Sequence, residues 1–119
     1  MNTVTKVFPV AILALALLQG CAQPTPHPMD MTQAVQAAQT RADHEALAKH
    51  YEEAAKELEA KAEEHKKLLA QYQAKSYLYG KQIYSLEEHC QALIQADQKG
   101  AQANRRLATV HRQLATELK

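Results

Sequence analysis

The chain has no tryptophan, a single phenylalanine and only five tyrosines among its 119 residues. Beyond residue 30 it is rich instead in alanine, glutamine, glutamate, leucine and lysine. This composition is typical of long helices and coiled coils rather than of sheets. We therefore expect an all-α protein without strands. At this length the chain has room for one small domain.

The chain also lacks an excess of charge, since 14 basic and 13 acidic residues give a net charge of +1. A surface that binds nucleic acid needs a surplus of lysine and arginine, so we expect no nucleic-acid partner. The charges are unevenly spread: residues 43–67 are rich in acid, whereas the last segment is basic. Two such segments would attract each other if they lay side by side.

The patterns on which enzyme sites are built are missing as well. The sequence contains no glycine-rich phosphate loop and no evident set of nucleophile, base and acid. It offers no close pair of carboxylates on a concave surface either. We therefore expect that the protein is not an enzyme.

One long apolar run lies near the N-terminus. Lys6 precedes residues 7–18, which are apolar apart from Pro9. The run is too short to span a bilayer stably, but it suits the central part of an export signal. We predict that residues 1–20 are a signal peptide.

The signal ends in Leu18-Gln19-Gly20-Cys21, which resembles the lipobox of bacterial lipoproteins. The resemblance implies cleavage before Cys21, a diacylglyceryl group on its thiol and an acyl chain such as palmitate on its new amino group. Several acyl chains, at about 0.8 kcal/mol per buried methylene, anchor a protein to the membrane permanently. Because Ala22 follows the cysteine, rather than the aspartate of inner-membrane lipoproteins, the resemblance favours the outer membrane, facing the periplasm.

Residues 21–30 form the next segment. Its three prolines, Pro24, Pro26 and Pro28, block a helix and favour an extended conformation of about 3.1 Å per residue. We interpret this segment as a tether between the lipidated Cys21 and the folded part.

Residues 31–119 are predicted to be helical, with a short first helix over 31–39 and N-cap candidates at Thr40 and Asp43 for the long helix that follows. Apolar residues at steps of three or four continue to Tyr79 and resume beyond Gly80. The side chains expected to face inward are Leu47, Tyr51, Ala54, Leu58, Ala62, His65, Leu69 and Tyr72, then Ile83, Leu86, Cys90, Leu93, Asp97, Gly100, Asn104, Leu107, His111, Leu114 and Leu118. The pairs Glu52/Lys56, Glu57/Lys61 and Glu63/Lys67 suit an exposed face.

A turn near residues 77–81, with Gly80 as a left-handed helix cap, predicts an antiparallel helical hairpin. The alternative is a single coiled-coil rod, because the stepping keeps nearly the same phase through Gly80. An internal repeat favours two similar arms: at an offset of 46, Leu47, Ala55, Ala62, His65 and Leu68 recur as Leu93, Ala101, Ala108, His111 and Leu114. The many alanines make each apolar face modest, so we expect either a homo-oligomer, such as two hairpins in a four-helix bundle, or a partner protein.

Four candidate ligands, His44, His65, Cys90 and His111, lie on or near the inward positions. A turn centred near residues 77–78 would bring His44 opposite His111 and His65 opposite Cys90, while a turn centred on Gly80 would shift these partners. Two interpretations stay open at this point: a metal or haem site, and hydrogen-bonded residues of the helix contact. Cys90 is the one thiol left once Cys21 is lipidated, so it is a candidate for an intermolecular disulfide or a small buried side chain.

Four tyrosines, Tyr72, Tyr77, Tyr79 and Tyr84, gather at the predicted tip of the hairpin. Exposed tyrosines favour protein recognition. The alternative interpretation is that these rings close the end of the bundle.

The segment 42–48, with His89-Cys90 and His111-Arg112, resembles small helical lipoproteins and secreted proteins of bacteria, a resemblance that implies no activity. The leading hypothesis is a structural or protein-interaction lipoprotein of the cell envelope. The first alternative is a helical bundle that binds metal or haem. The second follows the resemblance to murein lipoprotein, which implies a peptidoglycan tether through the C-terminal Lys119.

Overall fold

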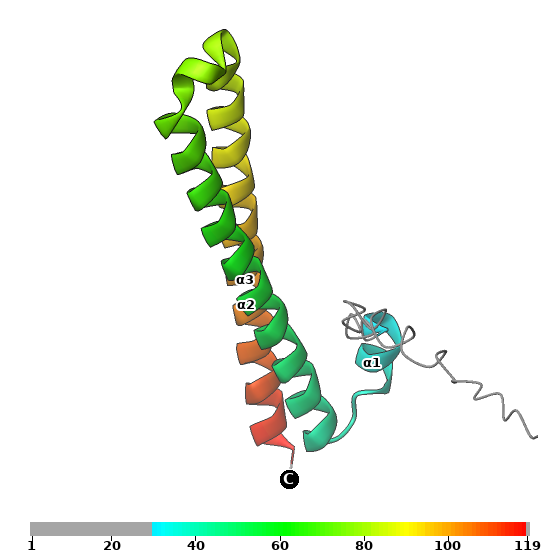
Figure 1. Ribbon diagram of the computed structural model, residues 1–119. Coiled ribbons are helices and arrows are strands. Elements are labelled where there is room, and N and C mark those ends of the chain that lie inside the picture. The colour runs from blue at the N-terminus through cyan, green and yellow to red at the C-terminus, as the bar shows by residue number, and fades with distance from the viewer. Residues whose placement is uncertain (1–29, 119) are drawn as a thin grey trace, which may run out of the picture.

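The computed structural model describes residues 30–118, which form a long helical hairpin with a short helix beside it (Figure 1). The elements are α1 (Met31–Ala37), α2 (Arg41–Ala74), two 3-10 turns, η1 (Ser76–Leu78) and η2 (Gly80–Gln82), and α3 (Ile83–Glu117). No strand occurs among these residues, and α2 packs against α3, so the predicted all-α hairpin is confirmed. The predicted signal peptide, Cys21, the three prolines and Lys119 lie outside the described residues.

The start of α2 follows the capping chemistry expected from the sequence. Thr40 is the N-cap: its side chain accepts a hydrogen bond from the backbone N–H of Asp43 at 3.2 Å. The Asp43 carboxylate in turn accepts hydrogen bonds from the backbone N–H groups of Thr40, at 2.9 Å, and Gln39, at 3.1 Å. Hydrogen bonding to the carboxyl group of Asp43, by the Thr40 side chain first and then by the backbone of Gln39 and Thr40, lowers its pKa. The box satisfies N–H groups that a helix start leaves without partners.

The chain reverses within residues 75–82. α2 ends at Ala74, five residues before the expected Tyr79, and the two 3-10 turns carry the chain into α3. Gly80 adopts a positive φ of 52°, and nothing lies within 4 Å of the position its Cβ would take. Glycine is therefore favoured by the backbone conformation and not by a lack of space.

The contact between the two long helices is built on alanine. Ala48, Ala55 and Ala62 recur at every seventh residue of α2 and are at most 2% exposed. On α3 the same spacing gives Ala101, Ala108 and Ala115, each at most 3% exposed. We call this contact the seam. Because methyl groups are short, they allow the helix backbones to approach closely, but they bury little apolar area.

The seam face of α3 differs from the expected one. The side chains expected to face inward include Leu93, Leu107, Leu114 and Leu118, but these are 46%, 43%, 36% and 38% exposed. The seam residues of α3 include five of the expected ones, Ile83, Cys90, Asp97, Asn104 and His111, and in place of the leucines Glu87, Ile94, Ala101, Ala108 and Ala115. The expectation mixed two neighbouring rows, both stepped by three and four, and periodicity alone could not say which row would meet α2.

A second apolar row on α3 stays outside the seam, and we call it the outer stripe. Its members are Leu93, Ala96, Gly100, Ala103, Leu107, Val110 and Leu114, of which Gly100 borders the seam, since a Cβ there would lie 3.0 Å from Leu58 Cδ1 of α2. Most are exposed, Val110 to 47%, so α3 has one apolar face against α2 and another toward solvent. No helix within residues 30–118 is long and apolar enough to cross a membrane.

Candidate functional site

Two histidines meet across the seam near the open end of the hairpin. His44 Nδ1 lies 3.0 Å from His111 Nδ1, and the two rings are stacked with centroids 5.3 Å apart. The Tyr51 ring stacks against His111 at 5.6 Å. A hydrogen bond between two Nδ1 atoms needs one proton between them, so at least one ring must be unprotonated there. Burial first, and then the charge of His44, lower the pKa of His111.

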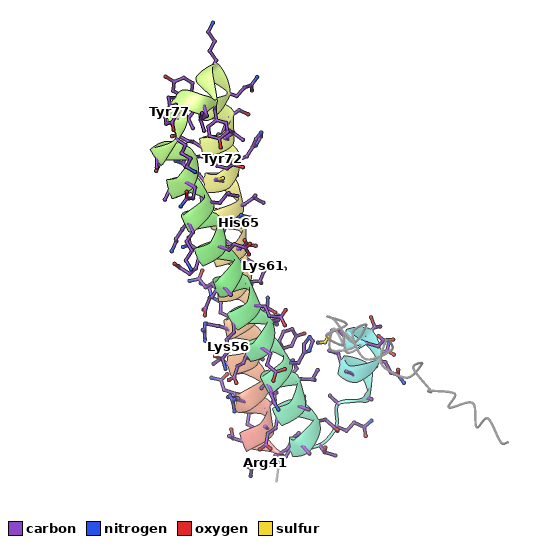
Figure 2. All side chains as sticks on the ribbon, in the orientation of Figure 1. Arg41, Lys56, Lys61, His65, Tyr72 and Tyr77 are labelled. Carbon is purple, nitrogen blue, oxygen red and sulfur yellow. The ribbon has the colours of Figure 1, made fainter. Side chains whose placement is uncertain are left out.

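A second polar layer lies further along the seam (Figure 2, where His65 is labelled). His65 Nε2 lies 3.6 Å from Asp97 Oδ2, which is beyond a hydrogen bond but within reach of a charge interaction when His65 is protonated. His65 Nδ1 and Asp97 Oδ2 are buried and have no hydrogen-bond partner in the described chain. Such a layer costs stability, but it favours one alignment of the helices over others.

The four candidate ligands therefore do not meet in one place, and Cys90 belongs to neither polar layer. His44 and His111 come together, as expected for a turn centred near residues 77–78, whereas His65 takes Asp97 rather than Cys90 as its partner. Within residues 30–118 no three His, Cys, Asp or Glu side chains are placed to hold a metal ion. Within these residues one hairpin thus offers an imidazole pair and no third ligand beside it.

Cys90 is a free cysteine that is 4% exposed. Its thiol lies in the seam, among the rows that join α2 to α3. An intermolecular disulfide through Cys90 would therefore require the seam to open first. Of the two interpretations of Cys90, the geometry therefore favours a small buried side chain over an intermolecular disulfide.

One edge of the hairpin is closed by ion pairs, and we call it the charged flank. Arg112 donates to both carboxylate oxygens of Glu52 at 2.8 and 2.7 Å, and Arg105 to both of Glu59 at 2.7 Å each. Hydrogen bonding to Arg105 lowers the pKa of Glu59. The acid-rich and basic segments do attract each other, but Glu52 binds Arg112 across the seam instead of the expected Lys56 on its own helix.

The opposite edge is apolar, and we call it the apolar flank. It consists of Leu47, Ala54 and Leu68 of α2 and Leu86, Leu93, Gly100, Leu107 and Leu114 of α3, with Lys61 among them. Leu47 is buried at 2% exposed, whereas Leu68 remains 40% exposed. No ion pair among residues 30–118 involves this edge, so it is open to apolar contact along most of the hairpin.

The four tyrosines at the tip separate into two pairs. Tyr72 and Tyr79 pack edge to face with centroids 5.3 Å apart, and both are half-buried. Tyr77 and Tyr84 are 79% and 76% exposed, and Leu78 beside them is 61% exposed. Figure 2 shows Tyr72 and Tyr77 near the closed end of the hairpin. One pair thus closes the end, and the other forms an exposed patch with Leu78.

Three features of this site escaped the sequence interpretation. These are the alanine seam, the cross-seam ion pairs and the division of α3 into two apolar rows. The signal for the first was present, because alanine recurs at every seventh position in both arms. The other two depend on how the two helices are rotated toward each other.

Comparisons of the chain with protein-family models, with curated proteins and with solved structures find no match.

Proposed function

We propose that the protein is a lipoprotein of the bacterial envelope, held by acyl chains at Cys21 and acting as a structural or protein-interaction module in the periplasm. The signal-like segment 1–20 and Leu18-Gln19-Gly20-Cys21 support the anchor. The outer membrane is the proposed location, since Ala22 follows the cysteine. No catalytic role is part of the proposal.

The observation that carries the interaction role is the exposed patch of Tyr77, Leu78 and Tyr84 at the tip. α2 starts and α3 ends at the other end of the hairpin (Figure 1). With α2 covering 34 residues, a helical rise of 1.5 Å places the tip about 50 Å from that end. A chain anchored through its N-terminus would therefore present the patch away from the membrane, where tyrosines suit a protein partner.

The anchor is tested by labelling cells that produce the full chain with a palmitate analogue. We expect label on the protein and its recovery with outer membranes, and loss of both in Cys21→Ala. An unlabelled wild-type protein in the soluble periplasmic fraction would overturn the proposal.

The tip is tested with a photo-crosslinking amino acid at position 77 in intact cells, with position 56 as the matched control. Lys56 is exposed on α2, far from the tip (Figure 2). We expect a discrete adduct of higher mass from position 77 and none from position 56. Equal adducts from both positions would contradict a role specific to the tip.

Metal or haem binding is the second candidate, because the imidazoles of His44 and His111 lie together. Metal analysis of the protein purified without a histidine tag, compared with His44→Ala, tests it. Stoichiometric metal that disappears in the variant would favour this function over the adaptor.

The fold gives less support to the alternative of a peptidoglycan tether through Lys119. The end of α3 lies beside the start of α2, so a hairpin returns the C-terminus toward its anchored end (Figure 1). Muropeptide analysis after lysozyme digestion decides this alternative, since a tether requires an adduct on Lys119.

A further inference from the structure

The outer stripe of α3 is a continuous apolar surface that one hairpin leaves open. It runs from Leu93 to Leu114, a length of about 31 Å at the helical rise. Along it Leu93, Leu107 and Val110 are 46%, 43% and 47% exposed. Regular steps of three and four residues are the pattern by which a helix meets another helix.

The short helix α1 does not cover this surface. α1 comprises 7 residues, or about 10 Å, and it contacts α2 (Figure 1). The stripe is three times as long and belongs to α3. Within residues 30–118 the stripe therefore stays largely uncovered.

We propose that the occupant is a second copy of this chain, docked on the apolar flank so that α3 of each copy packs against α2 of the other. The result is a four-helix bundle of two hairpins that point the same way, with its two-fold axis along the hairpins. Lys61 lies within this contact, and its aliphatic stem can follow the apolar surface while the ammonium group reaches solvent.

Charge complementarity selects this arrangement. Beside the apolar flank, α3 carries Lys99 and Arg106, whereas α2 carries Glu57 and Glu64. None of the ion pairs in residues 30–118 engages these four side chains. Packing α3 on the partner's α2 brings acid to base, while packing α3 on the partner's α3 would oppose basic residues.

The heights of these residues along the hairpin axis also fit this packing. A Cβ built on Gly100 would lie 3.0 Å from Leu58 Cδ1, so residues 57–58 and 99–100 stand at the same height. A two-fold axis along the hairpin preserves heights, so Lys99 of one copy meets Glu57 of the other. The parallel orientation also places both N-termini at one end, as two anchored chains require, and this step rests on the proposed function.

The arrangement is tested by co-producing two differently tagged full-length chains, one with Glu57→Cys and the other with Lys99→Cys, both with Cys90→Ala. We expect a disulfide-linked heterodimer on mild oxidation. The matched control replaces Lys99→Cys by Gln98→Cys, which lies seven residues before Arg105 in the row of the charged flank, and it should give at least 10-fold less heterodimer. Equal yields from both pairs would overturn the proposal.

Cells that produce only one of the two cysteine variants distinguish the other possible packings of the two copies. A Lys99→Cys chain that links mainly to itself would place α3 against α3 and overturn the proposed packing. No cross-link in any combination would overturn self-association and leave a lipid surface or another protein on the stripe. A 57–99 cross-link in a protein without lipid on Cys21 would support this packing and contradict the proposed anchor.

A second perturbation tests the stripe itself. In the cross-linking pair, Leu107→Glu places a carboxylate in the contact, and we expect at least a 10-fold loss of heterodimer. Gln102→Glu adds the same charge on the exposed face of α3 and should leave the yield within 2-fold. Circular dichroism checks that both variants keep the helical content of the parent. Unchanged yield in a folded Leu107→Glu chain would contradict the proposal.

Discussion

The two apolar rows of α3 differ in the size of their side chains. The row in the seam contains Ala101, Ala108 and Ala115, whereas the outer stripe contains Leu93, Leu107 and Leu114. In most amphipathic helices the large apolar residues face the partner helix and small ones lie at the margin. Here these three alanines are buried and these three leucines stay exposed. The hairpin thus gains close helix approach within one chain and keeps its larger apolar area for another contact.

The two flanks also differ, in whether their side chains find partners within one chain. The charged flank is closed inside one molecule by Glu52–Arg112 and Glu59–Arg105, while the apolar flank has no such closure. One edge of the hairpin is therefore polar and paired within the molecule, while the other is apolar and open to a second molecule. This asymmetry gives the hairpin a defined side on which to associate.

The largest effect should follow from enlarging a seam alanine. Ala108→Leu forces extra volume between helices in contact, and we expect a loss of about 1–3 kcal/mol in the free energy of unfolding. Ala103→Leu makes the same change on the outer stripe and should cost little or add stability. Urea denaturation of both variants measures the difference. If Ala108→Leu were the more stable of the two, the assignment of the rows would be wrong.

The turn decides which rows meet, and Gly80 is its most constrained residue. Gly80→Ala must hold a side chain at a φ of 52°, at a cost of about 1–2 kcal/mol. Gly80→Asn should cost less, because asparagine tolerates the left-handed region. Thermal unfolding compares the two, and equal midpoints would show that the backbone conformation is not what selects glycine here.

The seam should also be less stable in mild acid. The folded chain lowers the pKa of His111 below its ordinary value of 6.5, so below that pH the unfolded chain binds more protons. The free energy of unfolding should be unaffected above pH 6.5 and should fall as the pH drops from there to the folded pKa. His111→Gln should flatten this part of the curve, while His89→Gln, at an exposed position of α3, should leave it unchanged. An identical slope in His111→Gln would contradict the assignment.

The smallest effect is expected on the charged flank. A double-mutant cycle of Glu52→Ala and Arg112→Ala should give a coupling of at most about 1 kcal/mol, because both side chains are partly exposed. High salt should reduce it further. Glu53→Ala with Arg112→Ala is the matched control, and a coupling as large there would show that the measured term is general attraction and not the observed pair.

Much of the fold was predictable from local features. Thr40 and Asp43 predict the start of α2, and Gly80 marks the reversal, because caps and turns depend on chemistry within a few residues. The end of α2 at Ala74 was less predictable, since the stepped pattern continues past it and the tyrosine packing at the tip is a contact at a distance.

The candidate site was only partly predictable. The sequence alone singles out His44, His65, Cys90 and His111, but not that Asp97 would be the partner of His65. Such pairing depends on the relative height of two helices. The relative height of α2 and α3 depends on the conformation of residues 75–82 and on the packing of the alanines in the seam.

By itself, the sequence determined the helical class, the two arms, the reversal at Gly80 and the excess of acid on one arm over the other. All of these follow from periodicity, capping and charge, which act within a helix or over its whole length. Only the tertiary structure decided which row of α3 is buried, which residues pair across the seam and which flank stays apolar. The reason is physical: neighbouring rows on α3 are about one residue, or 100°, apart, and close packing of both helices is what chooses between them.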